Sequence, residues 1–384
     1  MIWRRLEEIQ GWLEEAGLDG WLLYDFRGLN PLAHRLTHLG SERVTRRWFC
    51  LVPREGEPAV LAHAIEATYF PGPARLERYH DRASLVGGLR KLLEGRSTLA
   101  MEHSPQGDNP YVGRVDSGTV DLVRALGKQV VSSGDLAQRL LTLSPQQQAD
   151  HRTAAQGLGA AIREGMAWLR ERREAVSEQA LARYLAGRVE ARGLIAEHEP
   201  AVSFGTATRD PHYAPSAHRA LEPGQPVLVD MVCKVPSALA PFADITWVAH
   251  SGPPSPEFAR AFAAVKAAQQ RGLEYLQQRF AARDYPEGHE ADAAVRGVLE
   301  AAGYAPALLH RSGHNLGSQH VHGEAAHLDG WETLDRRRLL PGFAFTLEPG
   351  VYLEGFGVRS ELNFLTHAEG IEVTTPVQCE IELI

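Results

Sequence analysis

The sequence predicts two domains, an α/β domain over residues 1–142 followed by an α+β domain over residues 143–384. A chain of 384 residues divides more readily into two domains than it forms one. Helical and strand-like segments alternate singly in the first part, whereas long amphipathic helices separate pairs of strand-like segments in the second. At the junction, Ser144 and Pro145 are suited to start a helix.

The first domain begins with a predicted amphipathic helix over residues 2–16, and Gly17 is suited to the position after its end. The apolar run at residues 21–24 predicts a buried strand. Two more apolar runs flank a Gly-Glu-Pro turn, which predicts a hairpin. The hairpin strands are predicted at residues 49–52 and 59–62. They are followed by a predicted helix at residues 84–93, a strand at residues 99–101 and a helix at residues 116–126.

The second domain combines long helices with short strands. Ser177 and Ser255 are suited to cap two of its helices. Residues 358–364 alternate in character, which predicts one strand with Arg359 and Glu361 on the same face. The other predicted elements are helices at residues 145–172, 178–189, 256–280 and 289–302, and strands at residues 226–230, 244–249 and before Glu348.

Composition restricts the class of protein. A net charge of −8 and a pI near 6.1 argue against a nucleic-acid partner. The chain has three widely separated cysteines and no CxxC pair, which favours a reducing compartment. Acidic residues stand where a signal peptide is apolar, and no run is long enough to span a membrane. We therefore expect a soluble cytoplasmic protein.

Two aspartates are predicted to meet in one hairpin. The strand at residues 226–230 ends in Asp230, and the strand at residues 244–249 begins with Asp244. Like charges that are brought together repel, so one carboxyl group of a bare pair stays protonated. A divalent cation between the two aspartates is the alternative.

Three further residues extend this hypothesis. His314 lies between Gly313 and Gly317, which permit close backbone approach. Glu348 follows an apolar strand, and Glu361 lies on the next one. A carboxylate on an apolar strand is unfavourable to bury unless a partner charge or a metal offsets its desolvation.

Two interpretations are open for these residues. Each acid alone is explained more simply as a strand-end residue paired with one of the 40 Lys and Arg residues. Together the set favours two divalent cations, Mn²⁺ first and Co²⁺ or Zn²⁺ next, since these accept oxygen and imidazole ligands. Two such ions lie roughly 3.5–4 Å apart when carboxylates bridge them. The predicted ligands are Asp230, Asp244, His314, Glu348 and Glu361.

The motifs around these ligands resemble those of the pita-bread-fold metallopeptidases, which include methionine aminopeptidase, Xaa-Pro aminopeptidase and prolidase. The first domain resembles the creatinase-type domain of the proline-specific branch. The resemblance therefore implies a pita-bread catalytic domain over residues 143–384. The matching motifs are Val-Leu-Val-Asp230, Ala-Asp244-Ile-Thr, Ser-Gly-His314-Asn-Leu-Gly, Phe-Thr-Leu-Glu348-Pro-Gly and Gly-Val-Arg-Ser-Glu361.

The resemblance implies a role for each ligand. Asp244 and Glu361 correspond to the residues that bridge both ions, and Asp230 to a ligand of one ion. His314 and Glu348 correspond to ligands of the other ion. In such a site a hydroxide between the ions attacks the scissile carbonyl, and Glu348 also carries a proton.

Three other residues correspond to functional residues of the family. His212 matches an upstream histidine that contacts the substrate or helps to protonate the leaving amine. His322 matches a histidine that stabilises the tetrahedral intermediate. Arg359 is expected to orient Glu361 through its guanidinium fork. The alternative interpretation makes these three a loop histidine, a capping histidine and an ordinary strand ion pair.

The spacing departs from the family pattern at two places. Asp244 follows Asp230 by fourteen positions, where the pattern has eleven, and the interval from His314 to the second histidine also differs. His322 follows His314 by eight positions, one more than the pattern has, and His320 lies between them. Either the loop carries an insertion or His320 takes the role. The Val-His-Gly context favours His322.

We therefore expect a homodimeric metallo-exopeptidase that hydrolyses Xaa-Pro bonds in peptides with proline at the second position, as an aminopeptidase or a dipeptidase. The alternatives are a non-peptidase hydrolase or lyase of the same fold, and a non-catalytic peptide-binding module. The presence of all five ligands opposes both alternatives.

Overall fold

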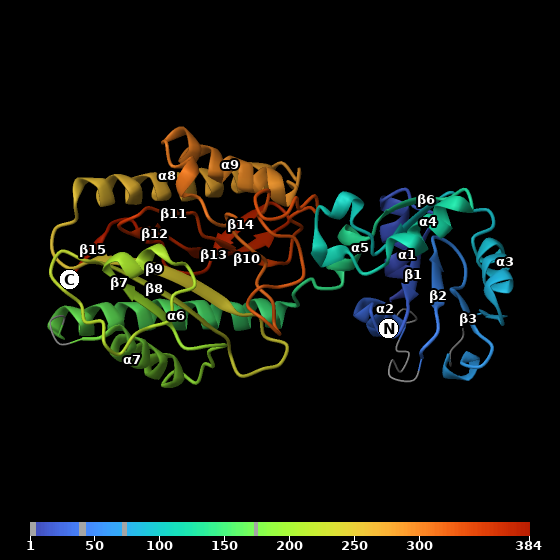
Figure 1. Ribbon diagram of the computed structural model, residues 1–384, viewed down its shortest axis with the longest axis horizontal. Helices are drawn as coiled ribbons and strands as arrows, with labels where there is room; N and C mark the ends of the chain where they lie inside the picture. Colours follow the sequence, from blue (N-terminus) through green and yellow to red (C-terminus); the bar gives the residue numbers. More distant parts are fainter. Residues whose placement is uncertain (1–4, 38–43, 71–74, 173–175) are drawn as a thin grey trace. The chain divides into compact units, whose positions relative to one another are not determined.

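The computed structural model describes residues 5–37, 44–70, 75–172 and 176–384 (Figure 1). The chain divides into two compact units, Met1–Leu140 and Leu141–Ile384. The predicted boundary after residue 142 falls two residues beyond this division. Among the described helices, none combines the length and apolar character that a bilayer crossing demands.

The first unit is built on one six-stranded sheet with the strand order β4-β3-β2-β1-β5-β6. β1 lies antiparallel to β2 and parallel to β5. The predicted hairpin is formed by β2 and β3, which pair Phe49 with Leu61. The strands are β1 (Gly20–Asp25), β2 (Trp48–Pro53), β3 (Ala59–His63), β4 (Arg75–Tyr79), β5 (Thr98–Met101) and β6 (Gln129–Ser132).

Helices cover both faces of this sheet. Trp21 and Leu23 of β1 pack into one apolar cluster with α1, whereas Leu22 and Tyr24 pack into another with α3 and α4. Residues 2–4 of the first predicted helix lie outside the described residues. The helices are α1 (Leu6–Glu15), α2 (Pro31–Thr37), α3 (Arg82–Leu92), α4 (Ser117–Ala125) and α5 (Gly134–Arg139).

Two pairs of long helices enclose the strands of the second unit (Figure 1). α7 and α8 begin at the predicted caps: the Ser177 hydroxyl accepts from the Ala180 N–H, and the Ser255 hydroxyl from the Phe258 N–H. The helices are α6 (Pro145–Arg172), α7 (Glu178–Glu190), α8 (Pro256–Ala281) and α9 (Gly288–Ala301).

The strands of the second unit form three small sheets, ordered β15-β9-β8-β7, β10-β13-β14 and β11-β12. α6 and α7 share an apolar cluster with β8 and β9, whereas α8 and α9 share another with β10 and β13. The strands are β7 (Ala201–Phe204), β8 (Pro226–Cys233), β9 (Ala243–His250), β10 (Ala344–Leu347), β11 (Gly350–Tyr352), β12 (Gly357–Arg359), β13 (Leu362–His367), β14 (Gly370–Val373) and β15 (Glu382–Leu383).

The prediction of one strand over residues 358–364 is wrong. This segment forms two strands instead. β12 pairs with β11, the pairing ends at Ser360, and β13 then pairs with β10. The Gln269 side-chain amide on α8 donates to the carbonyls of Ser360 (2.8 Å) and Leu347 (3.1 Å). This side chain interrupts the regular pairing, and Glu361 lies in the break.

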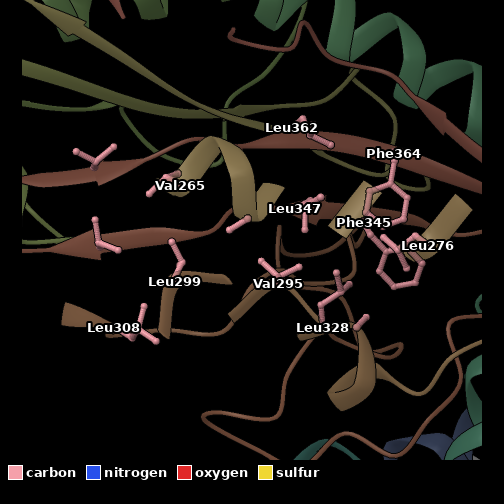
Figure 2. Close-up of a cluster of buried hydrophobic side chains, with 14 of the residues drawn as sticks. Val265, Leu276, Val295, Leu299, Leu308, Leu328, Phe345, Leu347, Leu362 and Phe364 are labelled. Carbon is pink, nitrogen blue, oxygen red and sulfur yellow. The ribbon is translucent and has the colours of Figure 1, made fainter. Parts of the chain in front are cut away.

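Apolar packing fixes the strand ends that carry the two glutamates. Figure 2 shows Leu347 and Leu362 in a buried cluster with Leu276 of α8. Leu347 pairs with Leu362 across β10 and β13. Since Glu348 directly follows Leu347 and Glu361 directly precedes Leu362, the core holds both acids at one end of this strand pair.

Replacing Glu372 with glutamine is expected to lower stability at neutral pH. Arg152 of α6 donates to both Glu372 oxygens at 2.7 Å, and the His367 Nε2 lies 3.0 Å away. Arg152, with His367, lowers the pKa of Glu372 to about 2. Both partners of the Arg152 pair are partly exposed, so we expect a loss of about 0.5–1 kcal/mol at pH 7.

The stabilisation of the fold by the ionised Glu372 carboxylate is fully present above its unfolded-state pKa near 4.5, and it is lost as the pH falls through its folded-state pKa of about 2. Urea unfolding at several pH values checks the prediction. The wild type and Glu372→Gln should converge below pH 4.5, with Glu354→Gln as the exposed control. A constant difference down to pH 3 would contradict it.

Candidate metal centre

β8 and β9 carry Asp230 and Asp244 on one face of their hairpin. The register pairs Asp230 with Thr246 and Asp244 with Val232, so the two aspartates are offset by two positions. Asp244 is buried, and its backbone N–H donates to the Asn363 Oδ1 at 2.8 Å. The hairpin is thereby connected to β13.

Glu348 and Glu361 extend from the β10–β13 pair toward the same region. The Thr346 hydroxyl donates to the Glu348 Oε1 at 3.0 Å. The Thr246 hydroxyl donates to the Glu361 Oε2 at 2.8 Å, and the Glu361 N–H donates to the Thr246 carbonyl at 3.4 Å. Thr246 of β9 therefore holds a glutamate from the other half of the unit.

His314 lies on a segment that runs beside β10. Its N–H donates to the Thr346 Oγ1 at 2.9 Å, and the Thr346 N–H donates to the His314 carbonyl at 2.8 Å. This approach requires Gly313, because a Cβ there would lie 2.3 Å from the Thr346 carbonyl oxygen. The His314 Nδ1–H donates to the Asn315 carbonyl at 3.0 Å, which leaves the Nε2 lone pair for another partner.

These side chains form a buried cluster with the chemistry of a metal site. Asp244, His314 and Glu361 offer ligand atoms within 4.8 Å of one another. The His314 Nε2 lies 3.7 Å from the Asp244 Oδ2 and 3.4 Å from the Glu348 Oε1. Asp244 Oδ1 and Glu361 Oε1 are buried and accept no hydrogen bond from the residues that the structure describes. Burying carboxylate oxygens without a partner is energetically unfavourable, and a divalent cation is a partner that suits such oxygens.

The pKa values reflect unbalanced negative charge. Burial, with Asp230 and Glu348 nearby, raises the pKa of Asp244. Burial and the Asp244 carboxyl raise the pKa of Glu361. Burial also opposes ionisation of Glu348, but the nearby His314 and His310 imidazoles and the Arg359 guanidinium lower its pKa to about 2. The acids therefore resist ionising together unless further positive charge enters the cluster.

Arg359 is buried beside the cluster, but its partners differ from the prediction. It donates to the Asp230 Oδ2 (2.5 Å), the Thr246 Oγ1 (2.9 Å) and the Tyr352 hydroxyl (3.0 Å). The expectation that its guanidinium fork binds Glu361 is wrong, because Thr246 lies between the two side chains. The strand break at Ser360 ends the regular alternation that this expectation assumed.

A cleft of about 710 Å³ opens beside the cluster, a size typical of sites for small ligands. His212 is exposed on its wall, and its backbone N–H donates to the Asp210 Oδ1 at 3.0 Å. The structure thus brings every predicted site residue except Glu361 to the cleft surface. The predicted residues that line it are Asp230, Asp244, His314, Glu348, Arg359, His212 and His322.

His322 and His320 face different surroundings. The His322 ring lies 4.2 Å from the His314 ring, centroid to centroid, and its Nδ1 lies 3.5 Å from the Arg311 Nη2. Desolvation, with His314 and Arg311 nearby, lowers the pKa of His322, so the ring is neutral at pH 7. The His320 ring is largely exposed and pairs with Glu197 at 3.0 Å. Of the two, His322 lies in the cleft.

Sequence reasoning missed the anchor of the His212 loop. Glu178 is fully buried and accepts hydrogen bonds from the N–H groups of Phe204 (2.8 Å) and Ser216 (3.0 Å) and from the Tyr213 hydroxyl (2.9 Å). Its oxygens therefore fix both ends of the segment that carries His212. The sequence signal was only that of an ordinary acid in the first turn of a helix.

Sequence reasoning also missed two residues connected to Arg359, Tyr352 and His310, of which His310 lines the cleft. The Tyr352 hydroxyl accepts from Arg359 and donates to the His310 Nε2 at 2.8 Å. The His310 Nδ1–H donates to the Arg311 carbonyl at 2.7 Å. Tyr352 follows Glu348 within the Glu-Pro-Gly-Val-Tyr motif, and that proximity was the available signal.

Known proteins share this sequence pattern. Residues 149–368 match the model of metallopeptidase family M24. A probable dipeptidase PepE of Mycobacterium tuberculosis is 28% identical over 342 residues, which cover 84% of this chain and 81% of that protein. An Xaa-Pro dipeptidase of Lactobacillus helveticus is 27% identical over 187 residues, 48% of this chain and 47% of that protein.

Solved structures share the fold. The crystal structure of dipeptidase PepE from Mycobacterium ulcerans superposes with a TM-score of 0.64 at 24% identity, covering 99% of this chain and 97% of that one. The two-part architecture predicted from the sequence, with a pita-bread fold in the second part, is confirmed.

Proposed function

Because the chain belongs to metallopeptidase family M24, whose model matches more than half of its length, we propose that it is an exopeptidase that hydrolyses Xaa-Pro bonds with two divalent cations. One observation carries the proposal. The buried cluster of Asp244, His314 and Glu361 includes two carboxylate oxygens that no described residue satisfies. These atoms belong to a donor set that suits Mn²⁺, Co²⁺ or Zn²⁺.

The cations would be held by carboxylates from both strand pairs and by one imidazole. When bound, they supply Lewis-acid chemistry, since they polarise the scissile carbonyl and lower the pKa of the attacking water. His314 offers its Nε2 because its Nδ1–H is committed to the Asn315 carbonyl. The proposed ligands are Asp230, Asp244, His314, Glu348 and Glu361, with Mn²⁺ as the first cation to test.

Other side chains act on the substrate and its protons. Glu348, with its pKa lowered to about 2, is ionised at neutral pH and accepts the proton of the attacking water. The neutral His322 ring donates a hydrogen bond to the scissile carbonyl oxygen as charge develops there. His212, on the cleft wall, contacts the substrate near its leaving amine. Arg359 and Thr246 keep Asp230 and Glu361 in place.

We also propose that the substrates are small peptides with proline at the second position. We propose a homodimer as the assembly. The names of two relatives, dipeptidase and Xaa-Pro dipeptidase, support peptides of this size.

A parallel assay of three substrates tests the function. The purified protein is stripped of metal and reloaded with Mn²⁺, Co²⁺ or Zn²⁺, and hydrolysis of Ala-Pro, Ala-Pro-Pro and Met-Ala is compared. We expect metal-dependent cleavage of a proline substrate with about two ions per chain. Cleavage of Met-Ala alone would overturn the Xaa-Pro preference. A protein that binds these metals and cleaves none of the peptides would support another hydrolase, a lyase or a peptide-binding module.

A further inference from the structure

The loop that follows His314 forms a tight hairpin between Gly317 and His322. The Gly317 N–H donates to the Val321 carbonyl at 3.1 Å, and Leu316 forms a bridge with His322. His322 therefore lies at the foot of this hairpin. Its position in the cleft depends on where the hairpin is held.

Glu197 binds this hairpin with both carboxylate oxygens. Its Oε2 accepts from the Val321 N–H at 2.8 Å, and its Oε1 accepts from the His320 Nδ1–H at 3.0 Å. The His320 side chain is 80% exposed, whereas that of Glu197 is 24% exposed. The hydrogen bond from the Val321 N–H holds the backbone of the residue directly before His322.

The segment that carries Glu197 is itself attached to the sheet. Ile195 and Lys234 exchange two backbone hydrogen bonds of 2.9 Å at the end of β8. The Lys234 Nζ also donates to the Ser318 carbonyl at 2.5 Å, on the other arm of the hairpin. The hairpin is thus held on one arm by Lys234 and on the other by Glu197.

We propose that Glu197 is a positioning residue that holds this hairpin so that His322 faces the substrate. This role rests on the proposed function, because it gives His322 its task. Glu197 lines neither the metal cluster nor the cleft; its carboxylate acts through the Val321 backbone. Without this attachment the hairpin would have more conformations available to it, and His322 would face the cleft in fewer of them.

The test compares Glu197→Ala with Glu197→Gln, which keeps an oxygen acceptor for the Val321 N–H. We expect Glu197→Ala to lower kcat by on the order of 10–100-fold with KM and bound metal unchanged. Glu197→Gln should retain at least about a third of the wild-type kcat. Gln319→Ala, at the tip of the same hairpin, and His320→Ala, which removes only the ring contact, serve as controls and should stay within about twofold of the wild type.

Two further measurements separate positioning from general support. Hydrogen–deuterium exchange of the peptide 317–324 should be about 10-fold faster in Glu197→Ala than in the wild type, without a change elsewhere in the second unit. In a His322→Ala background, Glu197→Ala should cause no further loss of kcat beyond about twofold, because the residue to be positioned is gone.

The outcomes distinguish this role from the proposed function. Unchanged exchange, unchanged kcat, or a full additional loss in the His322→Ala background would overturn the role of Glu197 in an active enzyme. Loss of bound metal together with kcat would also overturn it, since the effect would then be on the centre. Absence of peptidase activity in the wild type would overturn the proposed function, and with it the role assigned to Glu197.

Discussion

Glu361→Gln is expected to reduce peptidase activity by more than about 10³-fold and to lower the bound metal from about two ions per chain to one or fewer. The substitution keeps the size of the side chain and an acceptor for the Thr246 hydroxyl, which donates to Glu361 at 2.8 Å. It removes the charge that the proposed bridging role requires. Metal analysis after dialysis and steady-state kinetics with Ala-Pro measure the two effects.

A stability measurement distinguishes loss of a metal ligand from unfolding of this variant. The pKa of Glu361 is raised by burial and by Asp244, so its ionisation is unfavourable in the metal-free protein. Metal-free Glu361→Gln should therefore be at least as stable as metal-free wild type, whereas Mn²⁺ should stabilise only the wild type strongly. Full activity with an unchanged metal content would disprove the ligand assignment, and Glu354→Gln is the exposed control.

His322→Ala is expected to lower kcat by about 10²-fold, a loss of about 2.7 kcal/mol in transition-state stabilisation. The His322 ring lines the cleft 4.2 Å from the His314 ring, where a hydrogen bond to the developing oxyanion is within its reach. Bound metal should be unchanged, because His322 is not among the proposed ligands.

His320→Ala is the matched comparison for this prediction. Its ring is exposed and pairs with Glu197, so kcat should stay within about twofold of the wild type. If His320→Ala were the more damaging of the two, the second histidine role would belong to His320 and the loop register would be shifted by two residues. Steady-state kinetics on both variants with one proline substrate decide between these assignments.

The sequence was most informative where local chemistry decides the structure. Ser177 and Ser255 predicted the starts of α7 and α8, because a hydroxyl at the cap accepts an otherwise unsatisfied N–H. The apolar runs that end at Asp230 and start at Asp244 predicted the β8–β9 hairpin. Alternation and capping depend on residues close together in the sequence, so they can be predicted without knowledge of the tertiary structure.

The errors arose where distant residues decide the structure. The break at Ser360 depends on Gln269, a helix residue 91 positions away. Arg359 binds Asp230, 129 positions away, and Thr246 of β9 comes between Arg359 and Glu361. No periodicity within residues 358–364 encodes these partners. The contacts of Glu178 and Glu197 were missed for the same reason, since both side chains bind loops that fold back from elsewhere.

The proposed ligands come from two halves of the second unit that have separate hydrophobic cores. Asp230 and Asp244 belong to strands that pack against α6 and α7, whereas Glu348 and Glu361 border strands that pack against α8 and α9. Neither half alone contains the whole donor set, and Glu361 follows Asp230 by 131 positions in the chain. The proposed donor set is therefore complete only when residue 361 has been synthesised and both halves have folded, so binding of the proposed cations would be coupled to folding of the whole second unit.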